Sequence, residues 1–409
     1  MTIARDPVEL TRLLVRQNTI NPPGDEAAAI AILASLLEEA GFALLMVELA
    51  PGRPSLIARL AGSDPQAPAL GFTGHVDVVP LGETPWRRDP FAGETEGDRL
   101  FGRGTADMKA GVAAMVVAAC RIARQPRGRA GLELVLTAGE EIGCAGAKRI
   151  VTTPGALGRV GALVVGEPTG LAPRLGHRGV IWVRLRFRGR TAHASVPQAG
   201  DNAVLKAARA AIVLADHDFA GIGHPVLGRP TVNVGQIEGG LNLNSVPDAA
   251  VLGIDLRTVP GQSSEAILAE LAGMFPDSEA ELLVDCPPLW SEPGHEWLAL
   301  VAERAESVAG VRPVLAPVPF ATDAGYLTPA YGDPPTVVLG PGETEQAHRT
   351  DEWCSLTRIG QAAELYADLA ARWCHESRTR QKRPPSRLRA AEYAHSLTPS
   401  WRTGSFRLD

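Results

Sequence analysis

The first 170 residues alternate between two kinds of apolar spacing. Residues 7–18 and 26–40 carry apolar side chains at helical spacing, and Gly41 follows the second stretch as a stop signal. Continuous apolar runs bounded by turn residues predict buried strands at 55–60, 69–74, 132–138 and 162–167, with another at 336–340. Helical stretches at 108–124 and 143–152 lie between them. This alternation predicts an α/β fold with a mixed, mostly parallel sheet that is flanked by helices.

The middle of the chain has a different order of elements. A strand at 180–188 is followed by a helix near 201–215, strands near 230–237 and 249–257, a helix near 263–274 and a strand near 280–285. This β-α-β-β-α-β order predicts a ferredoxin-like α+β domain. We therefore expect an inserted lid or dimerisation domain at 179–290. Residues 1–178 and 291–374, ending with a helix near 357–373, would form the two parts of the larger domain.

Composition narrows the class of protein. Of the 409 residues, 45% are hydrophobic and 21% are charged, as in ordinary globular proteins. We find neither a run of about 20 apolar residues that could span a membrane nor the layout of a signal peptide. The five scattered cysteines form no CxxC pair, which argues against a disulfide scaffold or a cysteine-built zinc site. The cysteine usage favours a reducing cytoplasm, and no membrane association is expected. The net charge of −6 argues against nucleic acid as a partner.

The positive charge gathers at the C-terminal end. Residues 375–409 hold eight Lys or Arg against three acids, so residues 1–374 carry a net charge of −11. Little apolar periodicity accompanies this charge, which predicts a basic, poorly ordered tail. The alternative is an arm that docks on an acidic partner.

Ionisable side chains follow the predicted strands. The residues concerned are His75, Asp77, Glu140, Glu141, Glu167 and His348, with Asp107 in a turn before a helix. Taken singly, each acid predicts only a helix cap or a solvated loop. In open α/β sheets, however, the functional crevice lies beyond the carboxyl ends of the strands, so we expect these side chains at one edge of one sheet.

Five of these residues suit a metal: His75, Asp107, Glu141, Glu167 and His348. A set of imidazoles and carboxylates without sulfur is typical of zinc and similar divalent ions. Five ligands exceed the need of one catalytic zinc, so two metals sharing a carboxylate fit better. Asp77 could then accept the imidazole N–H of His75, and Glu140 could take a proton from the attacking water.

Five ordered motifs resemble a known enzyme family. They are GHVDVVP (74–80), GRGTADMKAG (102–111), TAGEEIG (137–143), GEPT (166–169) and GPGETEQAH (340–348). Together they resemble the dinuclear-zinc deacylases and peptidases that include acetylornithine deacetylase, succinyl-diaminopimelate desuccinylase, aminoacylase and related carboxypeptidases. The resemblance covers residues 8–373 and implies a zinc-peptidase-like catalytic domain.

The resemblance implies a metal site with assigned ligands. His75 and Glu167 would hold one ion and Glu141 and His348 the other. Asp107, joined to Met108 by a cis peptide bond, would bridge the two. Two divalent ions are expected, with Zn²⁺ first and Co²⁺ as the alternative.

The same resemblance assigns the remaining roles. A metal-bound hydroxide would cleave an amide bond with Glu140 as general acid/base, while Asp77 orients a ligand. His193 would reach the partner subunit's site in a homodimer formed through the inserted domain. Asn244 and Arg257 would bind the substrate, since a bidentate Arg suits a carboxylate.

Local strings bear on the substrate. FATDAGYL (320–327) and GPGETEQAHRTDEW (340–353) resemble the acetylornithine-deacetylase versions of these loops, and Glu167 is typical of deacylases and carboxypeptidases. We therefore expect deacetylation of an Nα-acetyl amino acid such as N-acetylornithine, in amino-acid biosynthesis. The alternatives are an N-succinyl-diaminopimelate desuccinylase, a carboxypeptidase or dipeptidase of this family, and a binding protein that has lost catalysis.

Overall fold

A computed structural model describes residues 6–219, 223–311 and 316–375. The predicted basic tail, His375 excepted, lies outside the described residues. The alternative that this tail docks on an acidic partner therefore concerns residues that are not described. Within the described ranges, no helix is both long and apolar enough to cross a bilayer.

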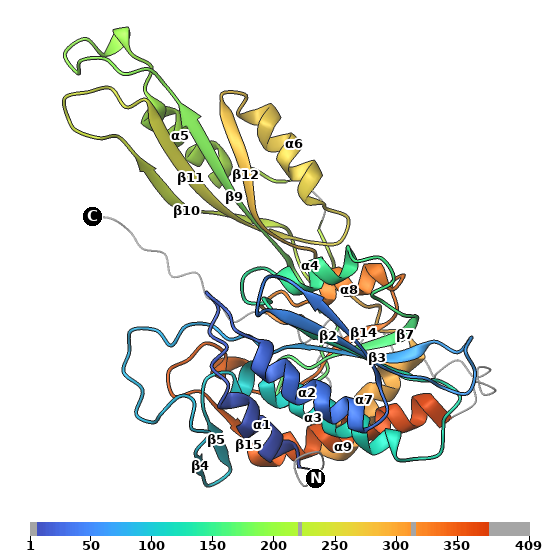
Figure 1. The fold of residues 1–409 in the computed structure, drawn as a ribbon. Helices are drawn as coiled ribbons and strands as arrows, with labels where there is room; N and C mark the ends of the chain where they lie inside the picture. Colours follow the sequence, from blue (N-terminus) through green and yellow to red (C-terminus); the bar gives the residue numbers. More distant parts are fainter. Residues whose placement is uncertain (1–5, 220–222, 312–315, 376–409) are drawn as a thin grey trace, which may run out of the picture. The chain divides into compact units, whose positions relative to one another are not determined.

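The larger domain is built on a six-stranded mixed sheet (Figure 1). Its strands, in spatial order, are β1 (Ala43–Glu48), β2 (Pro54–Leu60), β6 (Leu132–Thr137), β3 (Ala69–His75), β7 (Val160–Val165) and β14 (Thr336–Val338). Strands β6, β3, β7 and β14 run parallel, whereas β1 and β2 pair antiparallel. The predicted mostly parallel sheet is therefore confirmed, with β1 as an additional edge strand.

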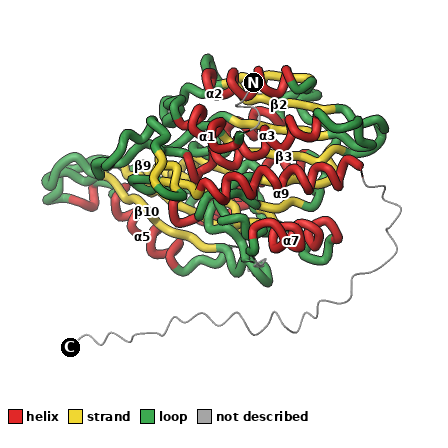
Figure 2. The backbone as a smooth tube through the Cα atoms, turned by 90° about the horizontal axis from the view of Figure 1, so that it is seen from below, coloured by secondary structure: helices red, strands yellow, loops and turns green. Residues whose placement is uncertain are grey.

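Helices cover both faces of this sheet because its strands are apolar on both sides. On β6, Leu134 and Leu136 pack into one core and Val135 into the other. The first core also contains residues of α1 (Pro7–Val15), α2 (Ala27–Glu39), α3 (Ala110–Ala123), α7 (Glu296–Ala309) and α9 (Leu356–His375). Figure 2 shows α1, α3, α7 and α9 in front of the strands. The second core contains residues of α4 (Ala145–Val151) and α8 (Ala324–Ala330).

The inserted segment forms a separate antiparallel sheet with two helices. The elements are β9 (Gly179–Arg188), α5 (Ala203–Ala215), β10 (Thr231–Gly239), β11 (Ala249–Thr258), α6 (Ser264–Met274) and β12 (Ser278–Cys286). Their sheet order is β10-β11-β9-β12, which is the ferredoxin-like arrangement. Side chains alternate between buried and half-buried along β11, and the buried set packs against both helices. The predicted fold class is thus confirmed, while the boundaries at 178/179 and 290/291 stay a prediction.

Two small sheets were not predicted. One joins β15 (Trp353–Ser355), β5 (Arg99–Phe101) and β4 (Thr95–Glu96), and the other joins β13 (Leu289–Trp290) and β8 (Gly176–His177). Strands of two or three residues are too short to show an apolar period. The β5–β15 pairing nevertheless brings the chain after His348 beside the turn that carries Asp107.

Candidate metal centre

Three neighbouring strands of the central sheet deliver most of the predicted ligands. His75 is the last residue of β3, Glu141 lies four residues after β6, and Glu167 lies two residues after β7. Because β6, β3 and β7 are adjacent and parallel, these side chains reach the same edge of the sheet.

Two turns complete the group. Asp107 lies in a wide turn, Thr105–Lys109, that leads into α3, and its peptide bond to Met108 is cis, as expected. His348 follows a short 3₁₀ turn at Thr344–Gln346 and has a left-handed backbone with φ of 62°.

The five side chains form two clusters that share Asp107. In the first, His75 Nε2 lies 3.2 Å from Asp107 Oδ1 and 3.6 Å from Glu167 Oε1. In the second, His348 Nε2 lies 3.1 Å from Glu141 Oε2 and 3.4 Å from Asp107 Oδ2. Each cluster offers three donor atoms within 4.8 Å of one another. The two oxygens of Asp107 therefore face different imidazoles, as a bridging carboxylate requires.

The charge of these side chains fits two cations. Asp107, Glu141 and Glu167 are largely buried, with two imidazoles as their nearest positive groups. Within the described part of the chain, Glu141 Oε1 has no hydrogen-bond partner. Burying carboxylates without compensation is costly, and oxygen and imidazole donors suit zinc and related divalent ions. The donor set thus fits a dinuclear centre.

Crowding of these groups shifts their pKa values. Burial raises the pKa of Glu140 well above its ordinary value; the His75 charge opposes this shift, and the Glu167 and Glu141 carboxylates add to it. Hydrogen bonds with Asp107 and Glu141 raise the pKa of His348 to about 10. Without cations, protons offset the crowded negative charge. We therefore expect cation binding to release protons.

Asp77 organises the loops around the centre. Its Oδ1 accepts a hydrogen bond from the main-chain N–H of Glu140 at 3.1 Å. Its Oδ2 accepts one from the main-chain N–H of Glu141 at 3.2 Å and one from the side-chain amide of Asn21 at 2.8 Å. His75 Nδ1 lies 2.9 Å from the Asp77 main-chain oxygen but 3.6 Å from Oδ1. The nearest acceptor for the imidazole is therefore a carbonyl rather than the carboxylate expected from the sequence.

Glu352, which is distant in sequence, forms hydrogen bonds with the turn that carries Asp107. Its carboxylate accepts the main-chain N–H groups of Gly104 at 2.9 Å, Ala106 at 2.8 Å and Asp107 at 3.2 Å. Arg103 Nη1 donates to the same carboxylate at 2.8 Å, and both side chains are buried. Sequence reasoning included Glu352 only within a motif. The residue thus acts on the centre through the backbone of Asp107.

Glu352→Gln is expected to weaken metal retention by about 10–100-fold, the range found when an outer partner of a metal ligand is lost. The amide NH₂ would face main-chain N–H donors and release the Asp107 turn. Competition with a chelator measures the change. Arg103→Lys is the matched control, because it disturbs the same buried ion pair but keeps the carboxylate and its main-chain bonds. Equal metal retention in both variants would contradict this role of Glu352.

The three residues predicted in the inserted domain lie apart from these clusters. His193 and Asn244 are exposed on adjacent segments, since the Ala194 N–H donates to the Asn244 carbonyl at 3.0 Å. Among the described residues, the polar neighbour of the His193 ring is Ser195, whose hydroxyl is 2.7 Å from Nδ1. Arg257 forms a two-point ion pair with Asp255, at 2.8 and 2.9 Å. None of the three contacts a candidate ligand within the described chain.

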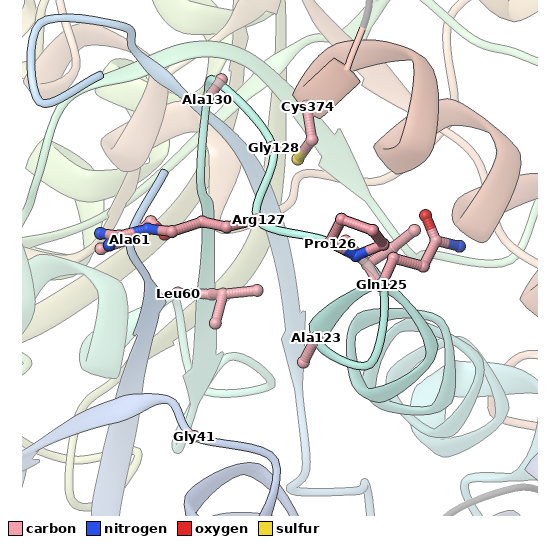
Figure 3. A pocket seen from close by; sticks show the side chains of 11 residues that line it. Gly41, Leu60, Ala61, Ala123, Gln125, Pro126, Arg127, Gly128, Ala130 and Cys374 are labelled. Atoms are coloured by element: carbon pink, nitrogen blue, oxygen red, sulfur yellow. The ribbon is translucent and has the colours of Figure 1, made fainter. Parts of the chain in front are cut away.

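A pocket at the opposite end of the strands is a different feature (Figure 3). It measures about 320 Å³ and is lined by residues that include Leu60, Arg127 and Cys374. Leu60 pairs with Leu132, the first residue of β6, whereas the candidate ligands follow the last residues of the strands. The pocket is therefore not part of the metal centre.

Comparison with known proteins identifies the family of the chain. Residues 71–372 match the family model described as peptidase family M20/M25/M40. Two similar proteins are acetylornithine deacetylases. The one from Vibrio campbellii is 30% identical, with 87% of this chain and 95% of the relative covered; the one from Salmonella paratyphi B is 30% identical, with 90% and 97% covered.

Solved structures share the fold at lower identity. An M20 family metallo-carboxypeptidase from Sulfolobus solfataricus superposes with a TM-score of 0.76 at 18% identity, covering 90% of this chain and 99% of that one. The YXEP protein of Bacillus subtilis, described as a dinuclear metal binding peptidase, gives 0.64 at 18% identity over 91% and 99%. The chain belongs to peptidase family M20/M25/M40 and has the fold of a metallohydrolase of that family.

Proposed function

We propose that this protein is a dinuclear metal-dependent deacylase that removes the acetyl group of an Nα-acetyl amino acid, with N-acetylornithine as the first candidate. The observation that carries this proposal is the pair of clusters joined by Asp107, with the Glu140 carboxylate beside them. Similarity to acetylornithine deacetylases along 87–90% of the chain supports the choice of substrate.

The residues of the centre divide into two ligand sets around Asp107. His75 and Glu167 would hold one cation and Glu141 and His348 the other. Zn²⁺ is the expected ion, with Co²⁺ as the alternative. Two such cations would polarise the acyl carbonyl and make water at the site more acidic.

Glu140 has the position and environment of a general acid/base. It is adjacent to the ligand Glu141, and burial raises the pKa of its carboxyl well above the ordinary value. A buried carboxylate beside the cations can accept a proton from water and return it to a leaving group. Glu140 would thus take the proton of the attacking water and pass it to the leaving amine nitrogen.

Substrate contacts would come from the inserted domain. Arg257 presents a fixed guanidinium that could bind the carboxylate of the amino acid, provided that it exchanges its ion pair with Asp255 for the substrate. Asn244 would add a hydrogen bond. His193 would donate to the oxygen of the acyl group as negative charge develops on it.

A homodimer would allow His193 to act in the site of the partner subunit. Apolar side chains are exposed on α5 and the neighbouring edge strand β10: Leu205 is 50% exposed, Ile212 69% and Ile237 51%. Exposed apolar groups on an edge strand and an adjacent helix form a surface suited to pairing with a second copy. We therefore place the dimer contact on α5 and β10.

Mixing two inactive variants tests the shared site. His193→Ala and Glu140→Ala chains, unfolded and refolded together, are expected to regain activity, because a mixed dimer holds one site with both residues intact. If the mixture assembled randomly, about half of the dimers would be mixed, each with one complete site. Each variant refolded alone provides the control. Mixed dimers that form without any return of activity would contradict the proposal.

Amine release from a substrate panel tests the activity. The panel contains Nα-acetylornithine, N-succinyl-diaminopimelate, N-acetylmethionine and a dipeptide with C-terminal glutamate, each with Zn²⁺ or Co²⁺ and again after chelation. Metal-dependent turnover concentrated on acetylornithine is the expected result. Metal-dependent turnover of another panel member would support the same mechanism but show a different activity, that of a desuccinylase, aminoacylase or carboxypeptidase. Full activity after exhaustive chelation would contradict the metal mechanism, and two bound metals without turnover would favour a binding protein.

A further inference from the structure

Two buried cysteines meet beside the centre. Cys144 precedes α4 with a left-handed backbone, and Cys286 is the last residue of β12. Their sulfur atoms lie 3.3 Å apart, and the two residues are only 1% and 3% exposed. They come from segments 142 residues apart, so no short-range motif in the sequence pairs them.

Two carboxylates lie next to this thiol pair. The Cys144 sulfur is 3.4 Å from Glu140 Oε1. Asp323, which precedes α8 and is 2% exposed, accepts the Thr137 hydroxyl with Oδ2, while Oδ1 has no hydrogen-bond partner in the described part of the chain. Glu140, Cys144 and Asp323 each place a donor atom within 4.8 Å of the others, whereas Cys286 lies outside this set and contacts it through the Cys144 sulfur. An unsatisfied buried oxygen therefore belongs to a group with the spacing of metal ligands.

The donor chemistry of this group differs from that of the catalytic clusters. The catalytic set offers only nitrogen and oxygen, whereas two thiols here add soft ligands that favour Zn²⁺, Cd²⁺ and similar ions. Each Zn–S bond is about 2.3 Å, so two thiolates on a tetrahedral zinc lie roughly 3.7 Å apart. The observed 3.3 Å needs to widen by only a few tenths of an ångström.

We propose that Cys144, Asp323 and Glu140 form a third cation site, separate from the two catalytic clusters, for a thiophilic divalent ion such as Zn²⁺ or Cd²⁺, and that Cys286, which touches the Cys144 sulfur, moves in as a further ligand. Binding would release the thiol protons to solvent, because thiols coordinate metals as thiolates. It would also engage the Glu140 carboxylate and so stop proton transfer. Excess thiophilic metal would then inhibit the enzyme; this consequence, unlike the site itself, rests on the function proposed for Glu140.

Cadmium titration of the reduced holoenzyme tests the site. With both catalytic positions already filled by Zn²⁺, Cd²⁺ is expected to bind once per chain, to produce an ultraviolet thiolate-to-cadmium charge-transfer band and to abolish turnover. Released Zn²⁺ is measured in parallel. Inhibition accompanied by Zn²⁺ release and no thiolate band would overturn the proposal, since cadmium would then be exchanging at the catalytic centre.

Substitutions identify the ligands. Cys286→Ser is expected to keep the basal activity and to lose about half of the charge-transfer band. Cadmium affinity should fall by at least about tenfold, the lower limit of the loss seen when an outer partner of a metal ligand is removed. Asp323→Asn keeps both thiols and should weaken binding without removing the band. Cys120→Ser is the matched control, because Cys120 is equally buried and contacts the Leu36 carbonyl instead. A band that persists unchanged in Cys286→Ser would overturn the assignment, whether or not Asp323→Asn folds.

Discussion

Replacing Glu140 by glutamine is expected to lower kcat by about 10²–10⁴-fold while both cations stay bound. The amide keeps the size of the side chain but accepts no proton from water. The ligands His75, Asp107 and Glu167 keep their contacts, because none of their contacts with one another involves Glu140. Steady-state kinetics and metal analysis of the same preparation provide the two measurements.

The control for this variant is Glu83→Gln, which makes the same chemical change on an exposed loop. Its kcat should equal that of the unmodified protein. Retention of most of the turnover by Glu140→Gln would remove the general acid/base role. A loss of metal parallel to the loss of activity would show instead that Glu140 supports binding of the cations.

Asp107→Asn is expected to disturb both cations, whereas Glu167→Gln should disturb one. This difference follows from the geometry, since Asp107 Oδ1 faces His75 and Oδ2 faces His348, while Glu167 belongs to the first cluster alone. An amide leaves one oxygen and one poor ligand, so neither cluster keeps its full set of anionic donors. Turnover should fall below measurement in Asp107→Asn.

Counting metal ions per chain after gel filtration distinguishes the two variants. Fewer than one retained ion is expected for Asp107→Asn and about one for Glu167→Gln. Glu343→Gln serves as a control, because Glu343 pairs with Arg358 and belongs to neither cluster. Two ions retained by Asp107→Asn would contradict a bridging role.

The elements that sequence predicts well are those with a complete apolar signature. Strands β3, β6 and β7 are buried along nearly their full length, so that each reads as a continuous apolar run. Strand β1 fails this test because Leu45 and Met46 are exposed at the sheet edge, and its apolar residues extend over both faces. Periodicity reports burial, and an edge strand is buried too unevenly to show it.

The sequence predicts those candidate ligands whose place follows from the order of the strands. His75, Glu141 and Glu167 follow parallel strands, and the topology alone brings them to one edge. Contacts between distant segments have no local signature. Glu352 accepts the N–H of Asp107 across 245 residues, and Arg257, which was expected to bind the substrate, pairs with Asp255 two positions away. Contacts of this kind depend on which side chains meet after folding, and the local sequence does not show that.

The first and last strands of the inserted sheet lie side by side. Val180 of β9 pairs with Cys286 of β12, so the chain leaves the larger domain and returns to it at neighbouring positions. Strand β14 must find β7 although the insertion separates them in sequence. Once the insertion has folded, the loop to be closed is much shorter, and its closure costs correspondingly less conformational entropy. Early folding of the insertion would thus speed completion of the sheet, and a short turn joining residues 178 and 287 should leave the larger domain able to fold.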